Sequence, residues 1–210
     1  GFSVRTAIAG TSGVSGALSF RTGGATKGSS GSLAVKTGAA TSGTAGSVSL
    51  VIGSGDTSTG GRVVVNAGES TAHTGGSVSV ISGLGSATSS GVFSIKTADA
   101  GANGVSGALH FNSGTTSKGS SGSITLETGA AAKGTAGSVS VVIGGGDAGS
   151  GGRITINAGS STATSSGTGG MISLMTGAGT TTSSGGFSVR TAIAGTNGVS
   201  GALSFRTGGA

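Results

Sequence analysis

The octapeptide GALSFRTG, Gly16–Gly23, sets the pattern that the whole 210-residue chain follows. Its side chains alternate, so that Leu18 and Phe20 lie on one face of an extended segment while Ser19 and Arg21 lie on the other. Period-two alternation between flanking glycines is typical of a β-strand of about six residues. We therefore predict a short strand here, with its apolar pair turned inward.

The same apolar pair recurs along the entire chain. Its two members are always separated by one residue, and successive pairs are mostly 15 residues apart, with occasional longer spacings. The pairs are Phe2/Val4, Leu18/Phe20, Leu33/Val35, Val48/Leu50, Val63/Val65, Val78/Val80, Phe93/Ile95, Leu109/Phe111, Ile124/Leu126, Val139/Val141, Ile154/Ile156, Ile172/Leu174, Phe187/Val189 and Leu203/Phe205. The sequence is thus a tandem array of short units.

A longer repeat groups these units into blocks 1–91, 92–185 and 186–210, the last of them partial. Residues 1–25 recur at 186–210 with a single difference, Ser12 against Asn197. Because the chain begins and ends inside the repeat, we expect it to be a segment of a longer filament. The longer second block has its additional residues in the turn 160–170, and loops are where repeat proteins accept insertions.

Composition excludes several classes of protein. The chain has 49 Gly, no Pro, Cys, Trp or Tyr, and only 8% charged residues. So many glycines disfavour helices, and glycine without a three-residue period or proline excludes collagen. No apolar run approaches the roughly 20 residues of a membrane helix, and large side chains are too few for an ordinary enzyme core.

These patterns predict an all-β fold, a single-stranded parallel β-solenoid of about fourteen 15-residue coils with a thin cross-section and no caps. Residues 1–210 would form one continuous solenoid whose coils stack through backbone hydrogen bonds. The repeat resembles the β-solenoids of secreted fibres, adhesin stalks and repetitive surface proteins. That resemblance implies structural, adhesive or surface-binding work, and only occasionally catalysis.

Motifs that carry chemistry are weak. The GxGxxG string at 144–149 lacks the helix that a dinucleotide site needs. Asp56 and Asp147 lie in fragments similar to a calcium-binding nonapeptide, but a turn aspartate explains both. His73 and His110 are the only histidines, and the five acidic residues are spread along the chain, so no cluster of a base with an orienting partner is expected. We expect no enzyme, no catalytic residue, no cofactor and no metal.

Two outward surfaces are candidate contact sites. The first is apolar and suggests lateral packing of filaments, although a few tolerated exposed side chains would look the same. Its members are Val51, Val64, Ile81, Val92, Val142, Met171 and Met175. The second is a basic row that would face an anionic polymer, or would be a solvated edge that blocks sheet growth. Its members are Arg5, Arg21, Lys36, Arg190 and Arg206.

Together these features predict a non-catalytic extracellular filament segment, secreted or at the cell surface, with a structural, adhesive or matrix role. Its expected partners are further copies of itself, joined end to end and laterally, and an anionic polysaccharide or surface. Nucleic acid is not an expected partner, since nothing supplies aromatic stacking. The alternative is an ice-binding or other surface-binding solenoid, suggested by recurring threonines at Thr6, Thr22, Thr37, Thr97, Thr128, Thr176, Thr191 and Thr207.

Overall fold

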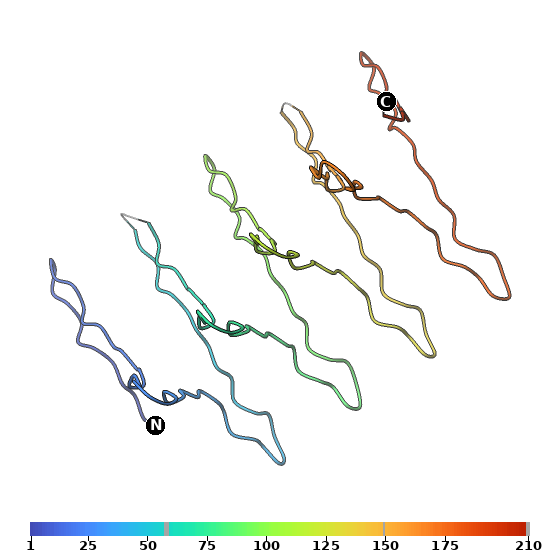
Figure 1. Cartoon of the computed structure of the whole chain (residues 1–210). Coiled ribbons are helices and arrows are strands. Elements are labelled where there is room, and N and C mark those ends of the chain that lie inside the picture. The colour runs from blue at the N-terminus through green and yellow to red at the C-terminus, as the bar shows by residue number, and fades with distance from the viewer. Residues whose placement is uncertain (57–58, 149, 209–210) are drawn as a thin grey trace. The chain divides into compact units, whose positions relative to one another are not determined.

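The computed structural model describes residues 1–56, 59–148 and 150–208. Within these ranges there is neither a helix nor a β-strand. The chain runs instead as extended segments that alternate with narrow loops (Figure 1). The extended segments carry the apolar pairs, and the loops consist mainly of Gly, Ser, Thr and Ala.

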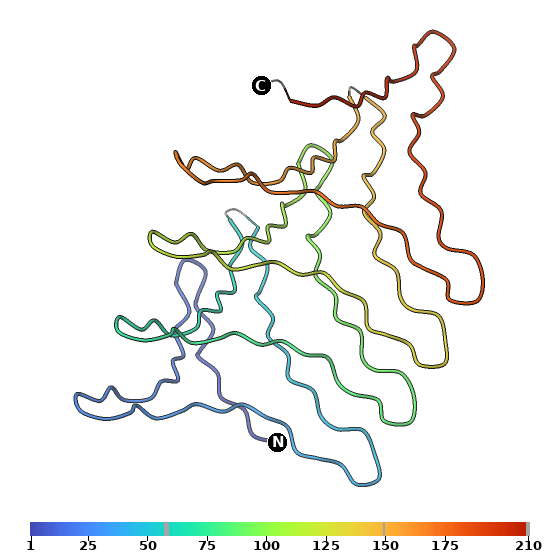
Figure 2. The ribbon, with the colours of Figure 1, turned by 45° about the vertical axis from the view of Figure 1, so that its right-hand side comes forward.

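The loops follow the period of the sequence. Bends lie at 26–28 and 41–43, again at 71–73 and 86–88, and later at 117–119 and 132–134, so neighbouring bends are 15 residues apart. A second view shows the same narrow loops in both halves of the chain (Figure 2). Each sequence unit therefore consists of one extended segment and one loop.

Seven loops close locally through a hydrogen bond between two glycines. The described residues make seven backbone hydrogen bonds to one another, and every one of them joins two glycines. Three close four-residue turns, such as the bond from the Gly13 N–H to the Gly10 carbonyl, 3.1 Å. Three others span eight residues, such as Gly76 N–H to Gly68 carbonyl at 2.9 Å. The last bond, from Gly170 to Gly159, spans eleven residues, so this loop contains the three inserted residues.

The predicted all-β parallel β-solenoid of fourteen coils, continuous over residues 1–210, is therefore wrong. A solenoid requires hydrogen bonds between the strands of successive coils, whereas the backbone bonds of the described residues stay within single loops. No described residue is buried, so the chain has little apolar burial to offset the conformational entropy of ordering stacked coils. Alternation correctly indicates an extended segment, but not what that segment pairs with.

The chain divides into two compact units, Gly1–Gly104 and Val105–Ala210. The division falls in the first loop of the second block, directly after the turn that Gly101 and Gly104 close. Each unit contains the same succession of extended segments and loops. Among the described residues no helix has the length and apolar character that crossing a membrane requires.

Candidate functional site

Side-chain hydrogen bonds cross the neck of some loops, the place where the two sides of a loop come together. In the loop that follows Leu18 and Phe20, the Thr22 hydroxyl donates a 3.2 Å hydrogen bond to the Gly31 carbonyl, nine residues further along the chain. Thr128 and Gly137 repeat this bond at 3.3 Å. The threonine side chain lies beside the glycine, where an added Cβ would be 3.4 to 3.6 Å from its carbon atoms. A small residue opposite threonine therefore lets the two sides of the neck approach.

The first loop of each block has its own closure. In the first block the Ser15 hydroxyl donates to the Ala7 carbonyl at 3.1 Å, and its oxygen lies 3.0 Å from the Thr6 hydroxyl. A serine hydroxyl has one hydrogen, so with that hydrogen on Ala7 the Thr6 hydroxyl is the donor to Ser15. Together with the turn between Gly10 and Gly13, this network fixes the neck and tip of the loop.

These first loops display apolar side chains that the sequence reasoning missed. Ile8, Val14, Val105, Ile193 and Val199 are each 96% exposed or more. They lie outside the register of the apolar pairs, which is why a search for pairs does not find them. These residues recur at equivalent positions of the long repeat, and that recurrence would have identified them. The second block has Asp99 at the position that Ile8 and Ile193 occupy in the other two.

A cavity of about 600 Å³ lies within the loop of the last block, lined by Thr191, Ala192, Ile193, Ala194, Gly195, Gly198, Val199 and Ser200. None of these side chains is titratable. Its lining therefore offers neither a nucleophile with a base nor a metal ligand set.

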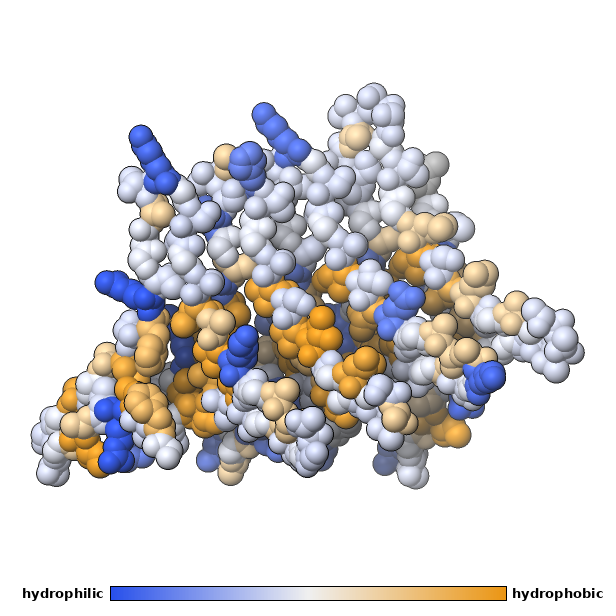
Figure 3. Space-filling model, turned by 90° about the horizontal axis from the view of Figure 1, so that it is seen from below, coloured by the Kyte–Doolittle hydropathy of each residue, from blue (hydrophilic) through white to orange (hydrophobic). Residues whose placement is uncertain are grey.

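The apolar pairs lie open to solvent. All fourteen retain between 49% and 93% of their side-chain exposure. In the space-filling view apolar side chains are visible at the surface, with polar and charged residues among them (Figure 3). A smaller hollow of about 230 Å³ is lined by Phe111, Ile124, Thr125 and Leu126, three of which are pair members. Its volume is below the range of small-molecule sites and suits a single apolar side chain.

The predicted lateral contact residues are exposed as well, with values from 59% for Val64 to 94% for Met175. Val51, Val64, Ile81 and Val92 belong to the first unit, while Val142, Met171 and Met175 belong to the second. They come from several extended segments. The prediction that they make lateral contacts stays a prediction.

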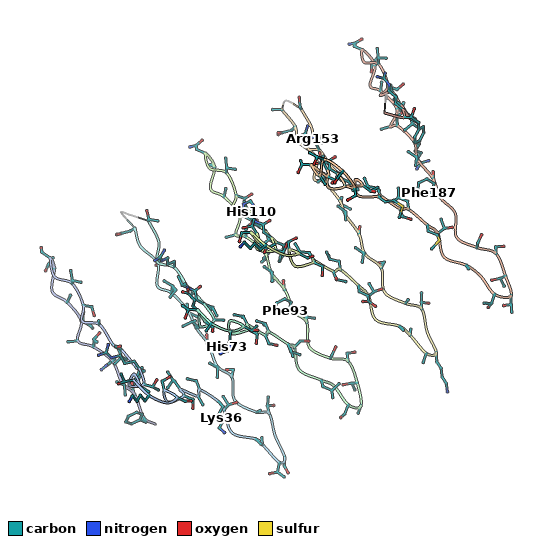
Figure 4. The ribbon with its side chains drawn as sticks, in the orientation of Figure 1. Lys36, His73, Phe93, His110, Arg153 and Phe187 are labelled. Atoms are coloured by element: carbon teal, nitrogen blue, oxygen red, sulfur yellow. The ribbon has the colours of Figure 1, made fainter. Side chains whose placement is uncertain are left out.

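The predicted basic row is exposed to solvent. Arg5, Arg21, Lys36, Arg190 and Arg206 are all exposed. Figure 4 labels Lys36 in the first unit and Arg153 in the second. Three further lysines, Lys27, Lys118 and Lys133, lie at the bends of their loops and were not singled out from the sequence. Each of them follows a threonine or serine by five residues, Thr22, Ser113 and Thr128 respectively, and that recurrence was the available signal.

The aspartates and histidines that could serve catalysis or metal binding are dispersed along the chain. Asp56 and Asp147 both lie at bends, as the turn interpretation expects. The His73 N–H donates a 3.0 Å hydrogen bond to the Ser70 hydroxyl within a loop, and His110 lies on an extended segment of the other unit (Figure 4). Over the part of the chain that the structure describes, no three His, Asp or Glu residues gather into a possible metal site. The GxGxxG string includes residue 149, which is outside the described residues.

The recurring threonines occupy loop necks. Thr6, Thr97 and Thr128 are less exposed than most of the chain, and the hydroxyls of Thr22 and Thr128 are bonded to backbone carbonyls. An ice-binding face needs rows of free, outward hydroxyls on a flat surface. These contacts give the ice-binding alternative no support.

Comparison with protein-family models, with curated proteins and with solved structures gave no match. The proposal for function therefore rests on the chain's own repeat and on the surfaces described above.

Proposed function

We propose that this chain is a non-catalytic structural or adhesive segment of an extracellular filament. The observation that carries the proposal is the repeated display of one exposed apolar pair per unit, fourteen times along the chain. Exposed apolar surface of this regularity is typical of proteins that associate with other molecules. An array of equivalent contact sites suits a structural protein that associates with its partners along its whole length.

Repetition also supplies affinity. A single apolar pair buries too little surface to hold two molecules together. When one pair is engaged, however, its neighbours are held close to their own partners, and each further contact forms at a high effective concentration. Weak contacts at 15-residue intervals therefore add up to a strong association, which is what a filament needs.

An extracellular location fits the composition. The chain has no cysteine and only two methionines, so it offers few sites for oxidation. Its low charge and many Ser and Thr hydroxyls suit a hydrated fibre, and exposed hydroxyls are also acceptors for O-linked sugars. The basic row, on a chain of net charge +6, provides a second surface for an anionic polysaccharide.

Electron microscopy of the purified chain at increasing concentration tests this function. We expect filaments to form and to bind a polysaccharide-coated surface. The ice-binding alternative predicts instead single chains that shape growing ice crystals. Single chains at every concentration, with ice crystals faceted by the protein, would overturn the filament proposal.

A further inference from the structure

Within the part of the chain that the structure describes, the backbone of the extended segments makes no hydrogen bond to another segment. All seven backbone hydrogen bonds among the described residues are at loops, where they join glycine to glycine. A folded protein makes about one internal hydrogen bond per residue. The extended segments around the apolar pairs therefore present two open edges, and such edges accept another extended chain.

The solvent-exposed area of the chain is much larger than that of a compact protein of the same mass. The chain exposes 20725 Å². A compact protein of 19.0 kDa would expose roughly 8,400 Å², and a fully extended one about 27,500 Å². Reaching a compact value requires burying roughly 12,000 Å² more, which exceeds the 2,000–5,000 Å² of usual obligate interfaces. A partner that follows the chain along its length can cover that area.

The chain itself has the properties that such a partner needs. The partner must be extended, must alternate apolar and small polar residues, and must repeat at 15-residue intervals so that one register serves every segment. A second copy meets all three conditions. The hollow lined by Phe111, Ile124 and Leu126 is also the right size for one apolar side chain of such a copy.

From these observations we propose that the extended segments pair edge to edge with extended segments of a second copy of this chain, and that the apolar pairs of the two copies close against each other. This inference rests on the proposed filament function and names its partner and its contact face. The loops that are closed by their own hydrogen bonds would remain outside the paired segments.

Two variants of equal charge test the contact face. One changes Phe20, Val35 and Val80 to Glu, and its matched control changes Ser19, Ala34 and Ser79 to Glu on the opposite face of the same segments. Burying carboxylates among apolar side chains is costly, so we expect the first variant to need at least about 100-fold more protein for half-assembly. The control should remain within about threefold of the wild-type chain, because its carboxylates stay in solvent.

Isotope-edited infrared spectroscopy tests whether the pairing is between copies. In assemblies mixed from ¹³C-labelled and unlabelled chains, pairing between copies shifts the coupled amide I band with the mixing ratio, whereas pairing within a chain leaves it unchanged. An unchanged band, or equal loss of assembly in both variants, would overturn the inference. Filaments that still formed in that case would leave the filament function standing, while a wild-type chain that never assembles would overturn both.

Discussion

At the scale of single residues, the glycines at the loop necks act through the space they leave. Among the described residues only Gly28 has a φ in the left-handed region, at 136°. The neck glycines have ordinary backbone angles, yet a side chain on them would contact the residue across the loop. Their role is close approach of two chain segments, which glycine permits because it has no Cβ.

The residue across the neck determines how well a glycine can be replaced. An alanine at position 61 would overlap the γ-methyl of Ile52, a β-branched side chain with little freedom to move. At position 46 the new methyl would lie 3.5 Å from Thr37, an ordinary contact. We expect Gly61→Ala to open its neck at a cost of about 1–3 kcal/mol and Gly46→Ala to leave its neck closed. Nuclear Overhauser contacts across each neck measure this, and equal loss in both variants would contradict it.

At the scale of one loop, hydrogen bonds rather than apolar contacts hold the first loop of each block. Ser15 bonds to both Ala7 and Thr6, whereas Ile8 is almost fully exposed. We expect Ser15→Ala to speed hydrogen exchange at the Gly13 amide, because it removes both side-chain bonds of the neck. Ile8→Asp, which copies the residue at position 99, should leave that exchange unchanged. A loop that opened on Ile8→Asp alone would contradict this account.

The elements also show what the sequence can predict and what it cannot. The alternation around Leu18 and Phe20 indicates an extended segment, and glycine-rich stretches such as 39–46 indicate turns. Both features are local, so they can be read from neighbouring residues. The strand's partner is not local, because an identical repeat would pair equally well with the next unit or with another copy. That ambiguity is why the predicted solenoid was wrong while the spacing of loops follows the repeat.

The candidate surfaces show the same limit. Exposed positions such as Arg21 and Val51 follow from alternation and from the scarcity of large side chains. The exposed Ile8 and Val14 were missed because they lie in a loop, where period two does not apply. Which of these surfaces meets a partner depends on contacts between molecules, and one chain's sequence does not specify them.

At the scale of the whole molecule, the basic and apolar surfaces should respond differently to salt. Contacts between solvated charges weaken as the Debye length falls to about 8 Å at 0.15 M salt, whereas apolar contacts persist. We expect binding to immobilised dextran sulfate to fall as salt rises while self-association is retained. Salt that dissolved the assemblies would show that charge, not apolar contact, joins the chains.

A matched pair of variants locates the anion-binding surface. Changing Arg5, Arg21 and Lys36 to Gln removes three charges from the basic row, and changing Lys27, Lys118 and Lys133 to Gln removes three from loop bends. If the row binds the polymer, the first variant should lose binding by about tenfold more than the second, measured at equal salt. Equal losses would mean that net charge alone attracts the polymer.

The central claim is that a single chain leaves its extended segments unpaired and that other copies supply the pairing. Far-UV circular dichroism combined with sedimentation velocity, on one concentration series, tests it most directly. The account predicts single chains without a strand signal at low concentration, and a strand signal that grows in proportion to the assembled fraction. A strand-rich spectrum from chains that sediment as monomers would contradict it.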